Sequence, residues 1–192
     1  DLEGFRRGKP LKKVGMKGND TAELFFENVK IPQTNLLGPE EGKGFYQLMK
    51  QLPWERLYIG IAGLGAADCA LEETLRYVKE RKAFGKRVFD FQNTKFKLAE
   101  LKTKTEVTRS FINDCIQKLV AGDLDAATAS MAKYWGSQIQ GEILDECVQL
   151  HGGYGFMAEY PVARMWTDAR VQKIYGGTNE IMKELIARSL DD

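Results

Sequence analysis

The helical pattern of the chain is clearest in residues 55–80, which read ERLYIGIAGLGAADCALEETLRYVKE. Large apolar side chains recur there at the three- and four-residue spacing of one helix face: Leu57, Ile61, Leu64, Leu71, Leu75 and Val78. A helix of this length spans roughly 40 Å at about 1.5 Å per residue. Each glycine in it costs about 1 kcal/mol relative to alanine. Gly60, Gly63 and Gly65 therefore indicate that something packs very closely against this helix.

The segments on either side continue the helical pattern. A short helix is expected from Phe45, with Pro53 either kinking it or beginning the next helix. Two more long helices are predicted by residues that share a face: Phe91, Leu98, Leu101, Thr105, Thr108, Ile112, Cys115 and Leu119 in one, which ends at residues 121–123, and Ala129, Ala132, Gly136, Ile139, Ile143 and Cys147 in the other, over residues 125–150. Shorter helices are expected at 159–171 and 179–190. Three long amphipathic helices with short connections predict a mainly α protein, an up-down helical bundle.

Residues 1–38 have a different pattern. Residues 22–32 are rich in β-branched and aromatic side chains and end at Pro32, which predicts a strand. We expect residues 11–16 to pair with it across the turn at 17–20. Because an isolated hairpin is marginal in water, this hairpin is expected to belong to a sheet whose other strands lie outside the chain. A boundary near residues 37–44 divides the chain into a β segment, 1–38, and a helical domain, 39–192.

The composition argues against several classes of protein. The 192 residues carry a formal net charge of +1 without a basic block, so we do not expect a nucleic-acid-binding protein. No apolar run reaches the roughly 18–20 residues that a transmembrane helix needs. A single histidine and the lack of a Cys-x-x-Cys pair argue against a metal site. Cys69, Cys115 and Cys147 are expected to be buried, reduced thiols, which favours a reducing compartment. The sequence opens at Asp1 rather than Met, and we expect it to be a piece of a longer protein.

Two glycine-rich breaks interrupt the helical pattern, at residues 149–155 and 174–180. Glycine permits positive φ angles and lets another group approach the backbone closely. The second break precedes a helix whose first turn offers free N–H groups, which suit a phosphate, a hydroxyl or a carbonyl oxygen. From the residues alone, the breaks are either ordinary caps and turns or the walls of a ligand site.

Four motifs occur in a fixed order: Arg81-Lys82-Ala83-Phe84-Gly85-Lys86 with Phe91-Gln92, Gln149-Leu150-His151-Gly152-Gly153-Tyr154-Gly155, Asp168-Ala169-Arg170, and Ile174-Tyr175-Gly176-Gly177-Thr178-Asn179-Glu180-Ile181. Over essentially the whole chain they resemble the C-terminal part of the acyl-CoA dehydrogenase family, and residues 179–188 most resemble its long-chain branch. The resemblance implies that residues 1–38 end a middle β domain and that 39–192 form the C-terminal helical bundle. It also implies FAD between those domains and a homodimer or homotetramer assembled through the bundle.

The chemistry that the resemblance implies is the α,β-dehydrogenation of an acyl-CoA thioester. A carboxylate removes the α-proton, and a hydride leaves the β-carbon for the flavin. Many relatives carry that carboxylate directly after the Ile-Tyr of the last motif, where this sequence has Gly176. The long-chain and isovaleryl branches carry it in a Glu-Arg-Leu context, which here assigns the catalytic base to Glu55, with Glu180 as the runner-up. A free carboxylate is a poor base for such a proton, and burial beside flavin and acyl chain strengthens it. Without the resemblance, Glu55 would be an ordinary first-turn glutamate favoured by the helix dipole.

The resemblance also implies binding roles for other residues. Those that match cofactor-binding positions are Arg81, Phe84, Gln92, Gln149, Leu150, His151, Gly152, Gly153, Thr178, Asn179 and Glu180. Those that match substrate-binding positions are Tyr46, Pro53, Trp54, Glu55, Arg56, Gly176 and Gly177. The 81–92 and 149–153 segments would serve the FAD of a neighbouring subunit. The side chain of His151 is interpreted as packing rather than catalytic, and Tyr134 and Trp135 as core or interface residues.

Three functional alternatives remain at this point. The first is a long-chain acyl-CoA dehydrogenase, and the second is the same chemistry on a branched short-chain substrate, with Glu55 compatible with both. Gly60 and Gly63 could leave depth for a long acyl chain, although close helix packing explains them equally well. The third is a module that serves only oligomerisation. The resemblance implies an electron-transferring flavoprotein as the acceptor and a mitochondrial matrix or bacterial cytoplasm as the compartment.

Overall fold

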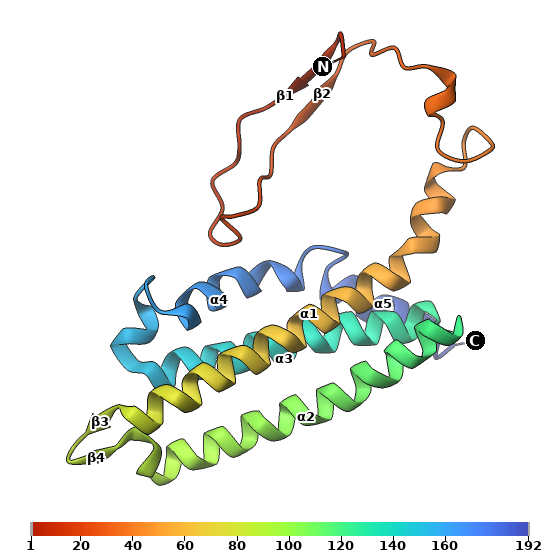
Figure 1. The fold of residues 1–192 in the computed structure, drawn as a ribbon. Coiled ribbons are helices and arrows are strands. Elements are labelled where there is room, and N and C mark those ends of the chain that lie inside the picture. The colour runs from red at the N-terminus through yellow and green to blue at the C-terminus, as the bar shows by residue number, and fades with distance from the viewer. Residues whose placement is uncertain (1, 192) are drawn as a thin grey trace. The chain divides into compact units, whose positions relative to one another are not determined.

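The computed structural model describes residues 2–191, which fall into two compact units, one ending at Gln51 and the other beginning at Leu52. Five helices carry most of the chain (Figure 1): α1 Gly44–Glu80, α2 Gln92–Ala121, α3 Ala126–His151, α4 Pro161–Ala169 and α5 Asn179–Arg188. Short 3-10 helices follow α3 and α4, at Gly152–Phe156 and Arg170–Lys173. The mainly α expectation is confirmed.

The first unit contains an antiparallel hairpin of β1 (Phe5–Arg7) and β2 (Leu24–Phe26), with Phe5 opposite Phe26. The strand predicted within residues 22–32 forms as β2. It pairs with β1, so the prediction that it pairs with residues 11–16 is wrong. Bonds from Gly8 N to Glu23 O (2.7 Å) and from Leu11 N to Thr21 O (2.8 Å) continue the pairing irregularly. Pro10 lies between them and has no N–H to donate, so the regular ladder of β1 breaks at this residue, and Leu11 resumes the pairing with its bond to Thr21.

Helix α1 is longer than the sequence pattern suggested. Pro53 lies inside it, so the alternative in which Pro53 begins a separate helix is wrong. A proline removes one hydrogen bond, and favourable helical residues on both sides can absorb that loss. Ile61 is exposed, contrary to the predicted stripe, whereas Ile59 and Leu64 are buried. The buried face of α1 is therefore centred on its glycines rather than on its large apolar residues alone.

The glycines of α1 are explained by the backbone of α3. A Cβ at Gly60 would lie 2.6 Å from the carbonyl oxygen of Ala132, and a Cβ at Gly63 would lie 2.9 Å from that of Gly136. Gly136 itself would meet the Cα of Gly60 at 2.7 Å. Both alternatives for Gly60 and Gly63 were open from the sequence, and these distances assign the two glycines to close helix packing. Gly65 has open space around it and plays no part in this contact.

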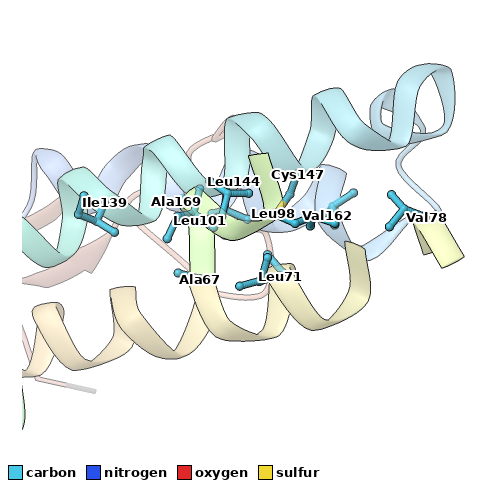
Figure 2. Close-up of a cluster of buried hydrophobic side chains, with 12 residues drawn as sticks. Ala67, Leu71, Val78, Leu98, Leu101, Ile139, Leu144, Cys147, Val162 and Ala169 are labelled. Carbon is cyan, nitrogen blue, oxygen red and sulfur yellow. The ribbon is translucent and has the colours of Figure 1, made fainter. Parts of the chain in front are cut away.

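The main core lies where α1, α2, α3 and α4 meet (Figure 2). It contains Ala67, Leu71 and Val78 from α1, Leu98 and Leu101 from α2, Ile139, Leu144 and Cys147 from α3, and Val162 and Ala169 from α4. Cys115 and Cys147 are buried free thiols as expected, but Cys69 is exposed, so the expectation of burial is wrong for that residue. Cys69 lies on α1 beside the buried Ala70, and neighbouring positions of a helix face different directions.

Helix ends follow the local chemistry of the sequence. Gly122 ends α2 with a φ angle of 83°. The connection between α1 and α2 is a two-strand hairpin in which β3 (Lys82–Ala83) pairs with β4 (Lys86–Arg87). Its turn residues, Phe84 and Gly85, have φ angles of 51° and 80°. Asp125 caps α3, because its carboxylate accepts a hydrogen bond from the Thr128 backbone N at 2.8 Å. The connections on either side of α2 are therefore fixed by residues that the sequence makes recognisable.

Removing the Asp125 cap should weaken α3. We expect Asp125→Ala to lower the free energy of unfolding by about 1 kcal/mol near neutral pH. The Thr128 hydroxyl and backbone N–H hold the pKa of Asp125 below its ordinary value. The stabilisation is therefore fully present above the pKa of the unfolded chain, and it disappears as the pH falls through the lower folded-state pKa. Denaturant unfolding of both proteins at several pH values measures this, with Asp123→Ala as the control from the same loop. A gap between the curves that stayed constant into strong acid would contradict the cap.

Candidate functional site

One group of predicted site residues gathers where the N-terminal half of α1 meets residues 174–180. A Cβ at Gly176, whose φ is 65°, would lie 2.4 Å from Cδ1 of Ile59. Ile59 follows Glu55 by one helical turn, so both lie on the same face of α1. The backbone at Gly176 therefore lies beside the α1 face that carries Glu55. The φ angle of Gly177 is 93°, which is also in the left-handed region, and a Cβ there would lie 2.8 Å from Cε of Met182.

The neighbouring residues of α1 have contrasting environments. Glu55 is exposed, whereas Arg56 is buried. Nη1 of Arg56 donates to Oγ of Ser130 at 3.5 Å, and its Nε has no hydrogen-bond partner among the described residues. Burial lowers the pKa of Arg56, and the charge of Glu55 opposes that shift. Pro53 is half-buried, and the exposed Trp54 stacks on Tyr58 with ring centroids 5.7 Å apart. This end of α1 therefore offers an accessible carboxylate next to a buried cation.

The start of α5 lies against α3 rather than standing free. Thr178 caps α5 by accepting a hydrogen bond from Ile181 N at 3.3 Å, and Glu180 in the first turn is exposed. Asn179 is buried, and its Oδ1 accepts hydrogen bonds from Lys133 Nζ at 2.9 Å and from Ser137 Oγ at 3.1 Å. Nδ2 of Asn179 is buried and has no partner among residues 2–191.

Lys133 is a residue of this site that the sequence interpretation missed. It follows Ala129 by four positions and precedes Gly136 by three, so it falls on the stripe predicted to be buried. That spacing was the available signal. The Lys133 side chain is fully buried, and burial lowers its pKa to about 8. The positive charge of Arg56 lowers this pKa further, whereas the negative charge of Glu180 raises it. A lysine on an apolar stripe is a rare arrangement and requires a hydrogen-bond partner.

A second group of predicted residues gathers where α1 ends and α3 ends. A cavity of about 470 Å³ there is lined by Tyr77, Arg81, Val88, Leu150, His151, Gly152, Gly153, Tyr154 and Met157. The Arg81 guanidinium lies over the ring of Tyr154, 5.4 Å from its centroid. Cβ atoms at Gly152 or Gly153 would meet nothing within 4 Å, so both glycines leave the wall open. Gln149 is exposed on the last turn of α3.

His151 is held by the protein on several sides. Its ring lies 4.2 Å from that of Tyr77 in a stacked arrangement, and its Nδ1 is 2.8 Å from the carbonyl oxygen of Cys147. The Tyr77 hydroxyl donates to the His151 carbonyl oxygen at 3.2 Å. Burial lowers the pKa of His151, which favours the neutral ring. These contacts are those of a packing residue that shapes the cavity wall.

The two groups of residues lie far apart. Glu55 and Glu80 belong to the same helix, and the 25 residues between them at about 1.5 Å each place them roughly 35–40 Å apart along α1. Phe84, which is 96% exposed, and the exposed Gln92 belong to the distant end with Arg81. Tyr46 lies in the first compact unit, where it contacts Phe45. The structure therefore brings the predicted residues together as two clusters and does not bring the clusters to each other.

Within residues 2–191, no group of three or more histidine, cysteine, aspartate or glutamate side chains is arranged to hold a metal ion. None of the helices there is both long enough and apolar enough to cross a bilayer.

Comparison with known proteins gives a consistent result. The family described as acyl-CoA dehydrogenase, C-terminal domain, matches residues 42–190. The mitochondrial long-chain specific acyl-CoA dehydrogenase of Rattus norvegicus is 57% identical over 189 residues, which are 98% of this chain and 44% of that protein. The crystal structure of an acyl-CoA dehydrogenase from Geobacillus kaustophilus is 49% identical with a TM-score of 0.96, over 100% of this chain and 50% of the other.

A Bacillus anthracis acyl-CoA dehydrogenase whose structure is complexed with FAD is 31% identical with a TM-score of 0.92, over 99% of this chain and 36% of that chain. The chain thus spans about half the length or less of these relatives. The family match and the shared fold cover nearly all of its own residues. The chain therefore belongs to the acyl-CoA dehydrogenase family, whose C-terminal domain it contains.

Proposed function

We propose that the chain is the C-terminal part of an FAD-dependent enzyme that dehydrogenates long-chain acyl-CoA thioesters in fatty-acid β-oxidation. Residues 1–38 would end the middle β domain, and residues 39–192 would form the helical bundle. The observation that carries the proposal is the position of Gly176 beside the α1 face that bears Glu55. The 57% identity to a protein named as long-chain specific favours that substrate over a branched short-chain acyl group.

Glu55 is the proposed base. Gly176 stands where many relatives carry their carboxylate, and a side chain there would meet Ile59. A carboxylate that reaches the same place from α1 needs the room that Gly176 leaves. Glu55 would remove the α-proton of the thioester, and Arg56 beside it matches a substrate-binding position of the family. Hydrogen bonds from backbone N–H groups near Gly176 would stabilise the charge that develops on the thioester oxygen.

The donors present in the bundle fit FAD, whose oxygens and phosphates are hydrogen-bond acceptors. Arg56 Nε and Asn179 Nδ2 are buried donors without partners among the described residues, and the N-terminus of α5 adds backbone N–H groups. At the distant cluster, Arg81 supplies a cation, and Gly152 and Gly153 leave space for a bulky ligand. When bound, FAD supplies the acceptor for the hydride of the β-carbon. The residues of the chain itself would bind FAD, orient the thioester and remove its α-proton.

The separation of the two clusters supports a shared arrangement of sites. The two clusters lie roughly 35–40 Å apart along α1. We therefore propose that the Glu55 and Thr178–Glu180 end contacts one cofactor, while Arg81, Phe84, Gln92 and residues 149–153 contact the cofactor of another subunit. This requires a homodimer or a homotetramer. An electron-transferring flavoprotein is the proposed acceptor, and a mitochondrial matrix or bacterial cytoplasm is the proposed compartment.

The proposed function is tested by the colour of the full-length protein. We expect the purified protein to carry FAD with its visible absorbance, and to lose that absorbance within seconds of adding a long-chain acyl-CoA without oxygen. Isovaleryl-CoA, added at the same concentration, is the comparison substrate. Faster bleaching by isovaleryl-CoA would shift the proposal to the branched short-chain substrate. A full-length protein that self-associates but neither binds FAD nor reacts with either thioester would favour a module that serves only assembly.

A further inference from the structure

We propose that Lys133 is a positioning residue for the cofactor site: by holding Oδ1 of Asn179, it directs Nδ2 of the same amide to an acceptor oxygen of bound FAD. The inference rests on the proposed function, since it presumes that the start of α5 contacts the cofactor. It concerns a residue on a different helix, α3, which reaches the cofactor only through Asn179. It therefore adds a member to the site that none of the four sequence motifs contains.

The chemistry of the contact fixes the orientation of the amide. A lysine ammonium has only donors, so the atom of Asn179 that lies 2.9 Å from Lys133 Nζ must be the accepting oxygen. Ser137 Oγ, 3.1 Å from the same oxygen, is compatible with this assignment, because its hydroxyl can donate to it. Because the amide group is planar, Nδ2 occupies its other branch and points away from both donors. Lys133 thereby selects one of the two orientations that the Asn179 side chain could adopt.

The Nδ2 atom is a donor in need of an acceptor. Asn179 is 4% exposed, and its Nδ2 has no partner among residues 2–191. Buried amide donors are almost always paired, so an atom brought by a ligand is the expected partner. Asn179 is also the first residue of α5, a helix of ten residues whose N-terminus favours an electron-rich oxygen.

The charges around Lys133 favour the same kind of ligand. Lys133 has no carboxylate within 4.0 Å among the described residues, although it is completely buried. The charged groups that act on it are Arg56 of α1, a second buried cation, and Glu180 of α5, an exposed carboxylate. Two buried cations near one exposed carboxylate leave an electropositive interior behind Asn179. An acceptor oxygen of FAD would relieve that imbalance.

A double-mutant cycle in the full-length protein tests the inference. FAD dissociation constants would be measured by flavin fluorescence when FAD is added to the apoprotein. We expect Asn179→Ala and Lys133→Met each to weaken FAD binding about tenfold, the effect of one lost hydrogen bond. The double variant should also lose about tenfold rather than a hundredfold, because Lys133 acts through Asn179. Lys104→Met, which removes a lysine that binds Glu142 on the surface of α3, should leave the affinity within twofold.

Further variants separate this role from a general effect on folding. Asn179→Asp keeps an oxygen for Lys133 and Ser137, and its charge faces two buried cations, so it should not lower the unfolding midpoint; because it removes the Nδ2 donor, it should still bind FAD about tenfold more weakly. This variant decides the question even if Lys133→Met fails to fold. Unchanged FAD affinity in Asn179→Asp, or a hundredfold loss in the double variant, would overturn the inference. Unchanged FAD affinity with a raised KM for the acyl-CoA would also overturn it, by placing the acceptor oxygen on the substrate. A wild-type protein without affinity for FAD would refute the proposed function itself.

Discussion

Replacing Glu55 with glutamine should lower the rate of acyl-CoA dehydrogenation by about 10²–10⁴-fold, the usual range for the loss of a general base. Glutamine has nearly the same shape as glutamate and cannot accept the α-proton. The exposed position of Glu55 on α1 means that the change should not disturb the core. The bound FAD should therefore remain in place, since the proposed cofactor contacts come from other residues.

Two measurements distinguish a lost base from a damaged site. The first is the exchange of the substrate α-proton with deuterium in D₂O, which should stop in Glu55→Gln. The second is the visible flavin spectrum, which should stay that of the oxidised wild-type protein. Glu72→Gln, at another exposed glutamate of α1, is the matched control and should exchange at the wild-type rate. Normal exchange in Glu55→Gln, together with its loss in Glu180→Gln, would move the base to Glu180.

The second large effect is expected at Gly60. Its Cβ would lie 2.6 Å from the backbone oxygen of Ala132 and 3.0 Å from Cδ1 of Ile112. The isoleucine can move, but the carbonyl belongs to the middle of α3 and can shift only if the helices separate. We therefore expect Gly60→Ala to lower the free energy of unfolding by about 3 kcal/mol, the upper end of the usual overpacking cost.

Gly65→Ala provides a control five residues away on the same helix. Nothing lies within 4 Å of a Cβ there, so only helix propensity changes, and alanine should stabilise the protein by up to about 1 kcal/mol. Thermal unfolding followed by circular dichroism would measure both variants against the wild type. Opposite shifts in the unfolding midpoint are expected. A Gly60→Ala protein as stable as Gly65→Ala would show that α1 and α3 do not meet at this contact.

The helical part of the fold could be predicted because its signals are local. The Ala129–Cys147 stripe is buried as expected, and Asp125 and Gly122 mark helix ends by their own chemistry. Strand pairing was predicted less well, since it depends on residues that are distant in the sequence. The choice between β1 and residues 11–16 depends on Pro10, whose missing N–H matters only once the two chain segments are placed opposite each other.

The candidate site shows a similar division. The sequence singled out Glu55 and Gly176 by resemblance, but their proximity depends on how α1 packs beside residues 174–180. Lys133 was overlooked because a single lysine among small residues resembles a surface position. Its burial depends on Ser137 and Asn179, and Asn179 comes from a helix that begins 46 residues later. Polar residues inside a bundle are recognised only when their partners are known.

The close contact between α1 and α3 also controls axial registration. The Ala132 carbonyl fits against Gly60, and the Gly136 carbonyl fits against Gly63. If α1 slid along α3 by one turn, at least one carbonyl would meet a residue with a side chain: the Ala132 carbonyl would face Leu57 in one direction, and the Gly136 carbonyl would face Ala67 in the other. Glu55 lies on the same rigid helix, within about 8 Å of Gly60 along the axis, and Lys133 follows Ala132 directly. The two glycines therefore act as a stop against sliding, which keeps the carboxylate of one helix and the ammonium of the other at constant heights.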